Sequence, residues 1–233
     1  MESTRKKQLN RMFNPRGLAF FGGIASPGAF GNLIALSQIR YGYKGKLYPI
    51  SPRGGDIAGH KIFKNLDEVK GPIDLACVSV PARAVPEVLQ DCLAHGVTGV
   101  QVHSSGFAET GKIEGIELQK EIVRIARQGL RIVGPNCFGL HSPKGGITLL
   151  PGSDFNKEPG PAALISQSGG DGKPGRSKRG NRCGDHPAKN ARPLPIPWFS
   201  SVQQCAKGPA RHQPCGCAGN VSRAFGCIEN KNL

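Results

Sequence analysis

The segment from Gly22 to Gly31 has the residue types of a phosphate-binding loop. It follows an apolar run and reads Gly-Gly-Ile-Ala-Ser-Pro-Gly-Ala-Phe-Gly. Glycines at 28 and 31 would let the backbone approach a phosphate and let a following helix pack on its strand, while the helix N-terminus would supply free N–H groups. Their spacing differs from the G-x-G-x-x-G of dinucleotide enzymes, so a turn that merely joins strand and helix is an equal alternative.

A cation follows the second apolar run, in the segment Ser51-Pro52-Arg53-Gly54-Gly55. In enzymes that bind NAD, an Asp or Glu at this point holds the ribose diol. The positive charge of Arg53 instead suits a phosphorylated ribose, such as that of NADP or of coenzyme A. These residues therefore predict a ligand with a phosphorylated ribose if the loop binds a nucleotide.

Two further turns carry small or polar residues after apolar runs, Val80-Pro81 and Ser104-Ser105-Gly106. Each is a weak signal, because strand ends often carry turn-forming residues. Ordinary turn chemistry accounts for both of them as well as a binding role does.

The run Gly134-Pro135-Asn136-Cys137-Phe138-Gly139 is a more specific signal. Pro135 fixes the backbone, and Asn136 can both donate and accept hydrogen bonds at a turn that faces a site. Cys137 has the chemistry of a nucleophile, yet the sequence offers no positioned pair of His and carboxylate to activate it. We therefore interpret Cys137 as a packed small residue.

Apolar runs and helical periodicities alternate from residue 13 to residue 170. The predicted strands cover residues 17–21, 46–50, 75–80, 99–102, 131–133 and 162–165. The predicted helices cover residues 30–40 and 84–94 and the apolar face marked by Leu118, Ile122, Ile125 and Ala126. Such alternation indicates right-handed βαβ units. The predicted fold is α/β, a Rossmann-like doubly wound parallel sheet whose ligands sit outside the carboxyl ends of the strands.

The net charge of +15 is divided between two unequal parts of the chain. Residues 1–170 hold 20 Lys and Arg against 13 Asp and Glu, a net +7, and residues 171–233 hold 11 against 3, a net +8. The charge of the first part is spread over many positions, so we expect a solvated surface and no binding of nucleic acid. The apolar runs are too short for a transmembrane helix, so no membrane contact is expected.

The eight cysteines divide between the same two parts. Cys77, Cys92 and Cys137 stand where small buried or site-lining residues are expected, as in a cytosolic protein. The other five crowd the region after residue 170, without the paired Cys-x-x-Cys spacing of a structural zinc site. We therefore expect a cytoplasmic protein with no metal site.

Six motifs occur in one order along the first 170 residues. They are Phe13-Asn14-Pro15-Arg16, Pro27-Gly28, Val80-Pro81, Ser105-Gly106-Phe107-x-Glu109-x-Gly111, Ile132-x-Gly134-Pro135-Asn136-Cys137 and Ile165-Ser166-Gln167-Ser168-Gly169. In these motifs and their order, the chain up to Gly170 resembles the CoA-binding domain of NDP-forming acyl-CoA synthetases, relatives of the succinyl-CoA synthetase α subunit.

The resemblance implies a coenzyme A site and a set of residues that line it. The loop around Ser26, Pro27 and Gly28 would meet the CoA phosphates, and the other strand ends would line the rest of the site. Family members tend to place a Lys after the second strand, and Arg53 stands one position away from it. The candidate CoA-binding residues are Gly22, Ser26, Pro27, Gly28, Arg53, Val80, Pro81, Ser104, Ser105 and Asn136.

The resemblance also implies parts that this chain does not offer. Family members continue into a second, flavodoxin-like domain with a phosphorylated histidine, and an ATP-grasp domain or subunit, which handles ATP, ADP and Mg, phosphorylates it. His186 and His212 lack the apolar context of that histidine, so no catalytic residue is assigned. We expect the CoA-binding domain of an acyl-CoA synthetase, inactive alone. The alternative is a non-enzymatic CoA- or nucleotide-binding module with a basic interaction tail.

Four segments are predicted along the chain. Residues 1–12 form a basic lead-in, residues 13–150 the CoA-binding domain, residues 151–170 the start of a truncated second domain, and residues 171–233 an unpatterned basic tail rich in Cys, Pro and Gly. The tail is expected to be irregular or disordered, because it offers too little apolar surface to offset the entropy of ordering. We interpret it as an out-of-frame translation product, since the break falls inside a family motif. A genuine basic tail that binds RNA or a protein partner is the alternative.

If the tail is out of frame, another frame of the same DNA should encode the missing domain. Translation of the two other frames beyond codon 170 should yield a flavodoxin-like pattern of strands and helices with a histidine in an apolar context. Sequencing of the gene from an independent clone is the matching control. Two frames without such a pattern would favour the genuine tail.

Overall fold

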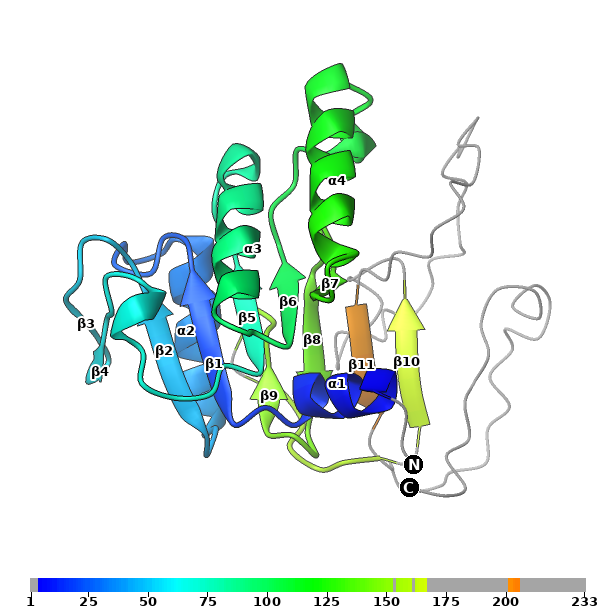
Figure 1. The fold of residues 1–233 in the computed structure, drawn as a ribbon. Coiled ribbons are helices and arrows are strands. Elements are labelled where there is room, and N and C mark those ends of the chain that lie inside the picture. Colours follow the sequence, from blue (N-terminus) through cyan, green and yellow to red (C-terminus); the bar gives the residue numbers. More distant parts are fainter. Residues whose placement is uncertain (1–3, 153, 161, 167–200, 206–233) are drawn as a thin grey trace, which may run out of the picture.

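The computed structural model of the chain describes residues 4–152, 154–160, 162–166 and 201–205. Its centre is a five-stranded parallel sheet in the order β2-β1-β5-β6-β7 (Figure 1). β1 has β2 on one side and β5 on the other, so the strand order reverses there, and ligands of such sheets bind at this point. The strands of this sheet are β1 (Gly17–Phe21), β2 (Lys46–Ile50), β5 (Leu75–Val78), β6 (Gly99–Val102) and β7 (Arg131–Val133).

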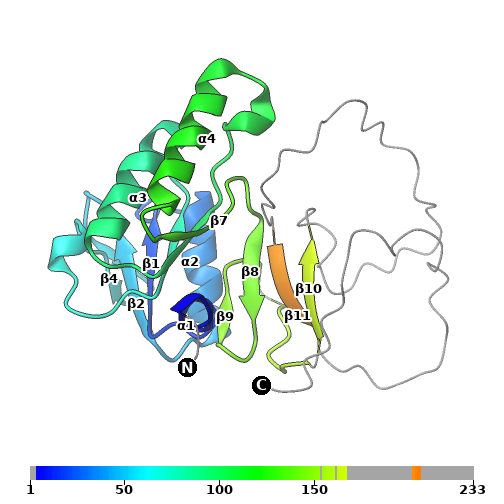
Figure 2. The ribbon, with the colours of Figure 1, turned by 45° about the vertical axis from the view of Figure 1, so that its right-hand side comes forward.

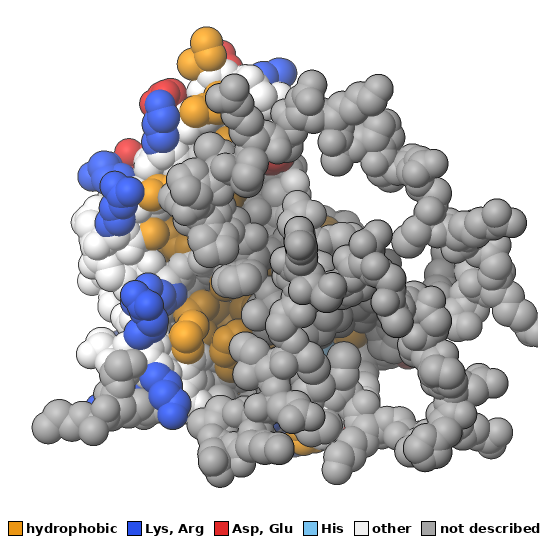
Figure 3. Space-filling view, turned by 90° about the vertical axis from the view of Figure 1, so that its right-hand side faces the viewer, with side chains coloured by type: hydrophobic (Ala, Val, Ile, Leu, Met, Phe, Trp, Pro, Cys, Tyr) orange, Lys and Arg blue, Asp and Glu red, His pale blue; other side chains and the backbone are white. Residues whose placement is uncertain are grey.

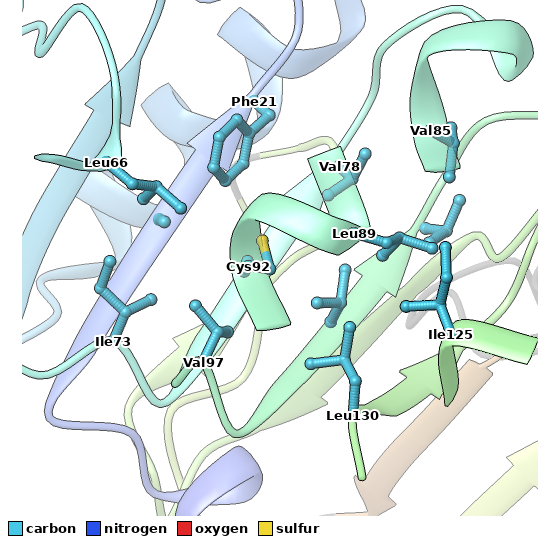
Figure 4. Packing of buried hydrophobic residues seen from close by; sticks show 14 of the residues in the cluster. Phe21, Leu66, Ile73, Val78, Val85, Leu89, Cys92, Val97, Ile125 and Leu130 are labelled. Atoms are coloured by element: carbon cyan, nitrogen blue, oxygen red, sulfur yellow. The ribbon is translucent and has the colours of Figure 1, made fainter. Parts of the chain in front are cut away.

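Helices cover both faces of this sheet, as in doubly wound folds. The helices α3 and α4 lie side by side on one face, and α1 and α2 pack on the other. Figure 4 shows Leu89 and Cys92 of α3 facing the strands. The four helices are α1 (Thr4–Phe13), α2 (Phe30–Tyr41), α3 (Val85–Ala94) and α4 (Ile113–Ala126).

The two cores of the domain follow from the alternation of side chains along each strand. In β1, Ala19 and Phe21 belong to the core under α3 and α4, whereas Leu18 and Phe20 belong to the core under α1 and α2. All four side chains are buried. Because both faces are covered, β1 and β5 at the centre of the sheet are apolar throughout, which is the pattern that predicted a buried parallel sheet.

A second sheet, in the order β10-β11-β8-β9, lies beside the first (Figure 2). In it β8 pairs antiparallel with β9 and parallel with β11. A hairpin of β3 and β4 follows β2 in the chain. The bounds are β3 (Asp56–Ile57), β4 (His60–Lys61), β8 (Gly139–Ser142), β9 (Ile147–Thr148), β10 (Ala162–Ser166) and β11 (Ser201–Cys205), with 3-10 helices η1 (Leu66–Glu68), η2 (Ala82–Ala84) and η3 (Ala108–Thr110).

The predicted fold class is confirmed, and the predicted strands and helices recur close to their expected bounds. β5 ends at Val78, two residues before its predicted end, because its neighbour β1 ends at Phe21 and the chain turns away at Gly22. The helix α1 and the strands β3, β4, β8, β9 and β11 were not predicted, and β11 falls inside the predicted irregular tail. The rest of that tail, residues 171–200 and 206–233, lies outside the described residues.

The described part of the chain bears on two further expectations, one about a transmembrane helix and one about the distribution of surface charge. Its longest helix, α4, has 14 residues, and no helix there is long and apolar enough to cross a membrane. On the face drawn in Figure 3, Lys and Arg side chains are spread along one side, with Asp and Glu among the upper ones. On this face the charge is therefore dispersed, as expected for a solvated surface.

A buried carboxylate joins the starts of β1 and β5. Asp74 is 2 % exposed and accepts three hydrogen bonds from Arg16, from Nε at 2.8 Å, from Nη2 at 2.9 Å and from the backbone N–H at 2.9 Å. Its own N–H donates to the Gly17 carbonyl at 3.0 Å. Burial works to raise the pKa of Asp74, but the hydrogen bonds and the charge of Arg16 outweigh burial, so this pKa lies below its ordinary value.

The substitution Asp74→Asn should lower the free energy of unfolding by roughly 1–3 kcal/mol, because Arg16 loses a charged acceptor at a buried position. A depressed pKa contributes stability that is present above the unfolded pKa and is lost as the pH falls through the folded pKa. The difference from the wild type should therefore persist at neutral pH and shrink only below about pH 4. Urea unfolding measures it, with the exposed Asp154→Asn as control. Equal stability of the two variants would contradict this role of Asp74.

Candidate functional site

Three stretches of backbone meet at Gly22, directly after β1. A Cβ on Gly31 would lie 1.9 Å from the Gly22 carbonyl oxygen, and a Cβ on Gly22 would lie 2.4 Å from the Ser79 carbonyl. The φ of Gly22 is +93°, in the region that favours glycine. Side chains are excluded at both positions, so α2 packs directly on the end of β1, as the sequence analysis expects for Gly31.

The loop continues toward α2 as two tight turns. The Ser26 N–H donates to the Gly23 carbonyl at 3.0 Å, and the Ala29 N–H donates to the Ser26 carbonyl at 3.1 Å. Asn32, in the first turn of α2, holds the loop from inside, because its Nδ2 donates to the Ile24 carbonyl at 2.8 Å. Hydrogen bonds within the chain therefore define the shape of this loop.

The outer side of this loop is open. Pro27 and Gly28 are exposed, and a Cβ on Gly28 would meet no atom within 4 Å. Ala29 occupies the N-cap position of α2 and offers no side-chain acceptor, so the N–H groups of the first turn keep their partial positive charge. An open glycine loop that leads into such a helix N-terminus has the geometry of an anion site.

The side chain of Arg53 reaches this loop from the end of β2. Its Nη1 lies 3.5 Å from the Ser26 Oγ, at the long limit of a hydrogen bond. The backbone N–H of Arg53 donates to the Ser51 Oγ at 3.4 Å, and the residue is exposed. The structure thus places a guanidinium beside the glycine loop, with donors left over for an anion.

Ser104 joins the ends of β5, β6 and β7. Its hydroxyl donates to the Val80 carbonyl, and its own carbonyl accepts from the Asn136 N–H at 2.9 Å. Asn136 has a φ of +50° and is exposed, so its side chain stands at the surface of this edge. The hydroxyl of Ser104 therefore holds neighbouring loops in place, besides any contact with a ligand.

All ten residues that the sequence analysis singled out lie in loops at the carboxyl edge of the main sheet. Contacts link these loops in series, from Arg53 through Ser26, then through Gly22 and Ser79, and on to Ser104. The ten are Gly22, Ser26, Pro27 and Gly28 after β1, Arg53 after β2, Val80 and Pro81 after β5, Ser104 and Ser105 after β6, and Asn136 after β7.

Sequence reasoning missed an aromatic pair at this edge. The ring of Phe30, the first residue of α2, meets the ring of His103 edge-on, with centroids 5.1 Å apart. Phe30 is 42 % exposed, whereas His103 is 8 % exposed. Burial lowers the pKa of His103 to about 3, and the backbone of Cys137 opposes this shift only in part, so the imidazole is neutral at physiological pH. The position of His103 directly before Ser104 was the signal available in the sequence.

Cys137 does not have the environment of a nucleophile. It is 2 % exposed, and burial raises the pKa of its thiol to about 12, whereas a reactive cysteine needs a lowered pKa. It packs in the turn after β7, where its N–H donates to the Val102 carbonyl at 3.1 Å. Among the described side chains, no group of three His, Cys, Asp or Glu comes together in a way that could hold a metal ion.

Comparison with known proteins gives consistent matches for the part of the chain that carries this edge. Residues 16–143 match the family described as CoA binding domain. The chain is 42 % identical over 168 residues to the α subunit of ADP-forming acetate–CoA ligase I from Pyrococcus furiosus, over 69 % of this chain and 36 % of that relative. It is 32 % identical over 161 residues to the ADP-forming 4-hydroxybutyrate–CoA ligase of Nitrosopumilus maritimus, over 68 % of this chain and 23 % of that relative.

A solved structure agrees with these matches. The dinucleotide-forming acetyl-coenzyme A synthetase 1 of Ca. Korarchaeum cryptofilum, in complex with phosphate and ADP, is 38 % identical and superposes with a TM-score of 0.63, over 70 % of this chain and 34 % of that one. The chain spans about a third of the length of the Pyrococcus relative and of this synthetase. By its sequence, its strand order and its ordered motifs, the chain belongs to the family of CoA-binding domains found in NDP-forming acyl-CoA synthetases.

Proposed function

We propose that the chain binds coenzyme A along the carboxyl edge of its main sheet, as the CoA-binding part of an NDP-forming acyl-CoA synthetase. The observation that carries this proposal is the contact of Arg53 with Ser26, which puts a cation beside an open glycine loop and the N-terminus of α2. Phosphates are the groups that such a combination binds. The match of residues 16–143 to the CoA-binding family favours CoA among phosphorylated ligands.

The proposed site changes in chemistry along the edge. Ser26, Gly28 and Arg53, at the ends of β1 and β2, take the CoA phosphates. Ser105 and Asn136, at the ends of β6 and β7, are exposed and offer neutral donors and acceptors. The pantetheine arm of CoA carries amides, which such neutral groups bind. A ligand with a charged head and a long amide arm therefore fits the order of the loops.

In the complete enzyme the reaction is acid + CoA + NTP ⇌ acyl-CoA + NDP + phosphate. We assign CoA binding to this chain, and we assign the phosphorylated histidine and the ATP-grasp part, with its ATP, ADP and Mg, to other domains or a partner subunit. The match of residues 16–143 to the CoA-binding family supports the part of this division that concerns CoA. His186 and His212 lie outside the described residues and are given no role. The chain alone therefore binds CoA without turnover.

The relatives bear on where the acyl group is selected, and the cysteines bear on the compartment of the protein. Relatives that share this domain are named for different acids, acetate in one and 4-hydroxybutyrate in another, which supports selection of the acyl group outside this domain. Cys77, Cys92 and Cys137 are buried thiols outside any disulfide, as is usual in a reducing compartment, so we place the protein in the cytoplasm.

Calorimetric titration of CoA into the full chain should show binding in the micromolar range. NAD and NADP, titrated under identical salt, should bind far more weakly, because neither carries the pantetheine arm. Circular dichroism of the same sample shows whether the protein is folded. A folded protein that does not bind CoA would refute the ligand assignment. Tighter binding of NADP than of CoA would indicate that Arg53 belongs to a dehydrogenase-like site.

The substitution Arg53→Ala should weaken CoA binding about tenfold, because a charge-assisted hydrogen bond to a phosphate is lost. Arg53→Lys should recover part of the affinity, since it keeps the charge but not the planar fork. Arg40→Ala, in the last turn of α2, changes the net charge equally and is the control. If Arg53 meets the ribose phosphate, dephospho-CoA should bind the wild type and Arg53→Ala alike. Equal CoA affinity of Arg53→Ala and Arg40→Ala would count against the site.

A further inference from the structure

The turn after β6 contains a carboxylate whose two oxygens bind consecutive backbone N–H groups. The Gly106 N–H donates to Glu109 Oε1 at 2.7 Å, and the Phe107 N–H donates to Glu109 Oε2 at 3.1 Å. Hydrogen bonds from backbone N–H groups to an ionised carboxylate are stronger than those between neutral groups. Glu109 therefore holds the backbone of this turn with both of its oxygens.

The same turn lies between the loop after β5 and the core under α3 and α4. Gly106 has a φ of +109°, and a Cβ there would lie 3.2 Å from the Ala82 Cβ, so the turn lies against the segment after Pro81. On its other side Phe107 is fully buried in the core under α3 and α4, and its carbonyl accepts from the Thr110 Oγ1 at 2.8 Å. Phe107 thus anchors the turn, and Glu109 shapes it.

The turn begins directly after the two serines of the proposed site. Ser104 links the ends of β5 and β7, and Ser105 is exposed beside Gly106. A change in the direction of the Gly106 N–H rotates the peptide that it shares with Ser105. Without the carboxylate of Glu109, the two N–H groups would turn to water, and the exposed part of the turn would adopt more than one shape.

We propose that Glu109 is a positioning residue of the CoA site, which fixes the turn at Gly106 and Phe107 and so presents Ser104 and Ser105 to the ligand. The assignment rests on the proposed CoA-binding function. In this assignment Glu109 acts through the turn and not on CoA itself, since each of its oxygens accepts a hydrogen bond from the backbone of the turn.

The sign of the expected effect separates positioning from simple charge. CoA is anionic, so loss of an exposed carboxylate near the site strengthens its binding if only long-range charge counts. Positioning predicts the opposite, because a loosened turn has to be ordered when CoA binds. Glu114, exposed in the first turn of α4 and five positions further along the chain, offers the same change in charge as a control.

The test combines CoA titration into the full chain with hydrogen–deuterium exchange of residues 104–110. Glu109→Ala should weaken CoA binding about tenfold and speed the exchange of the Gly106 and Phe107 amides. Glu109→Gln keeps an acceptor oxygen and should fall between this variant and the wild type, and it replaces Glu109→Ala if that variant does not fold. Glu114→Ala should bind CoA at least as tightly as the wild type and leave the exchange unchanged.

Two results would overturn the assignment. One is a Glu109→Ala variant that binds CoA as tightly as the wild type with unchanged exchange at Gly106 and Phe107. The other is faster exchange with unchanged CoA affinity, which would make Glu109 a support of the turn alone. A wild type that binds no CoA would instead overturn the proposed function, and the exchange data would still show whether Glu109 shapes the turn.

Discussion

The close approach of three backbones at Gly22 is the constraint on which the candidate site depends. There the end of β1 touches the first turn of α2 at Gly31 and the end of β5 at Ser79, at distances that leave no room for a Cβ. This contact brings the glycine loop, the N-terminus of α2 and the loop after β5 to one point of the carboxyl edge. A side chain at either glycine would push α2 away from the sheet, and the loop that carries Ser26 would move with it.

On either side of Gly22, hydrogen bonds join the neighbouring loops along the carboxyl edge. Toward β2, Arg53 reaches Ser26, and toward β7, Ser104 joins the ends of β5 and β7. The opposite edge is held separately, by the buried carboxylate of Asp74 and its hydrogen bonds to Arg16. The domain thus stabilises its sheet at one edge and presents its loops at the other, so the loops can be shaped for a ligand without weakening the sheet.

The predicted and observed elements agree best where the local sequence determines the bounds of an element. Four strands have the predicted bounds, because each is a short, mainly apolar run that is followed by turn residues, namely 17–21, 46–50, 99–102 and 131–133. β5 is shorter than its apolar run because strand length also depends on the neighbour, and β1 ends at Phe21. α1 was not predicted, since its place is set by the packing of Met12 against Gly99, far away in the sequence. β8 was not predicted, since its four residues carry no periodic signal of their own and one of its two partners, β11, is distant in the sequence.

The sequence by itself determined the α/β class and the edge at which ligands of such a sheet bind, and it predicted ten site residues, all of which lie in loops at this edge. Only the tertiary structure decided which residues at this edge touch one another. The contact of Arg53 with Ser26 joins residues 27 positions apart, and the burial of His103 involves Phe30 from another element. Periodicity is a local property that records which side chains are buried and on which face. Contacts between loops depend on the order and spacing of the strands, and no local pattern contains these.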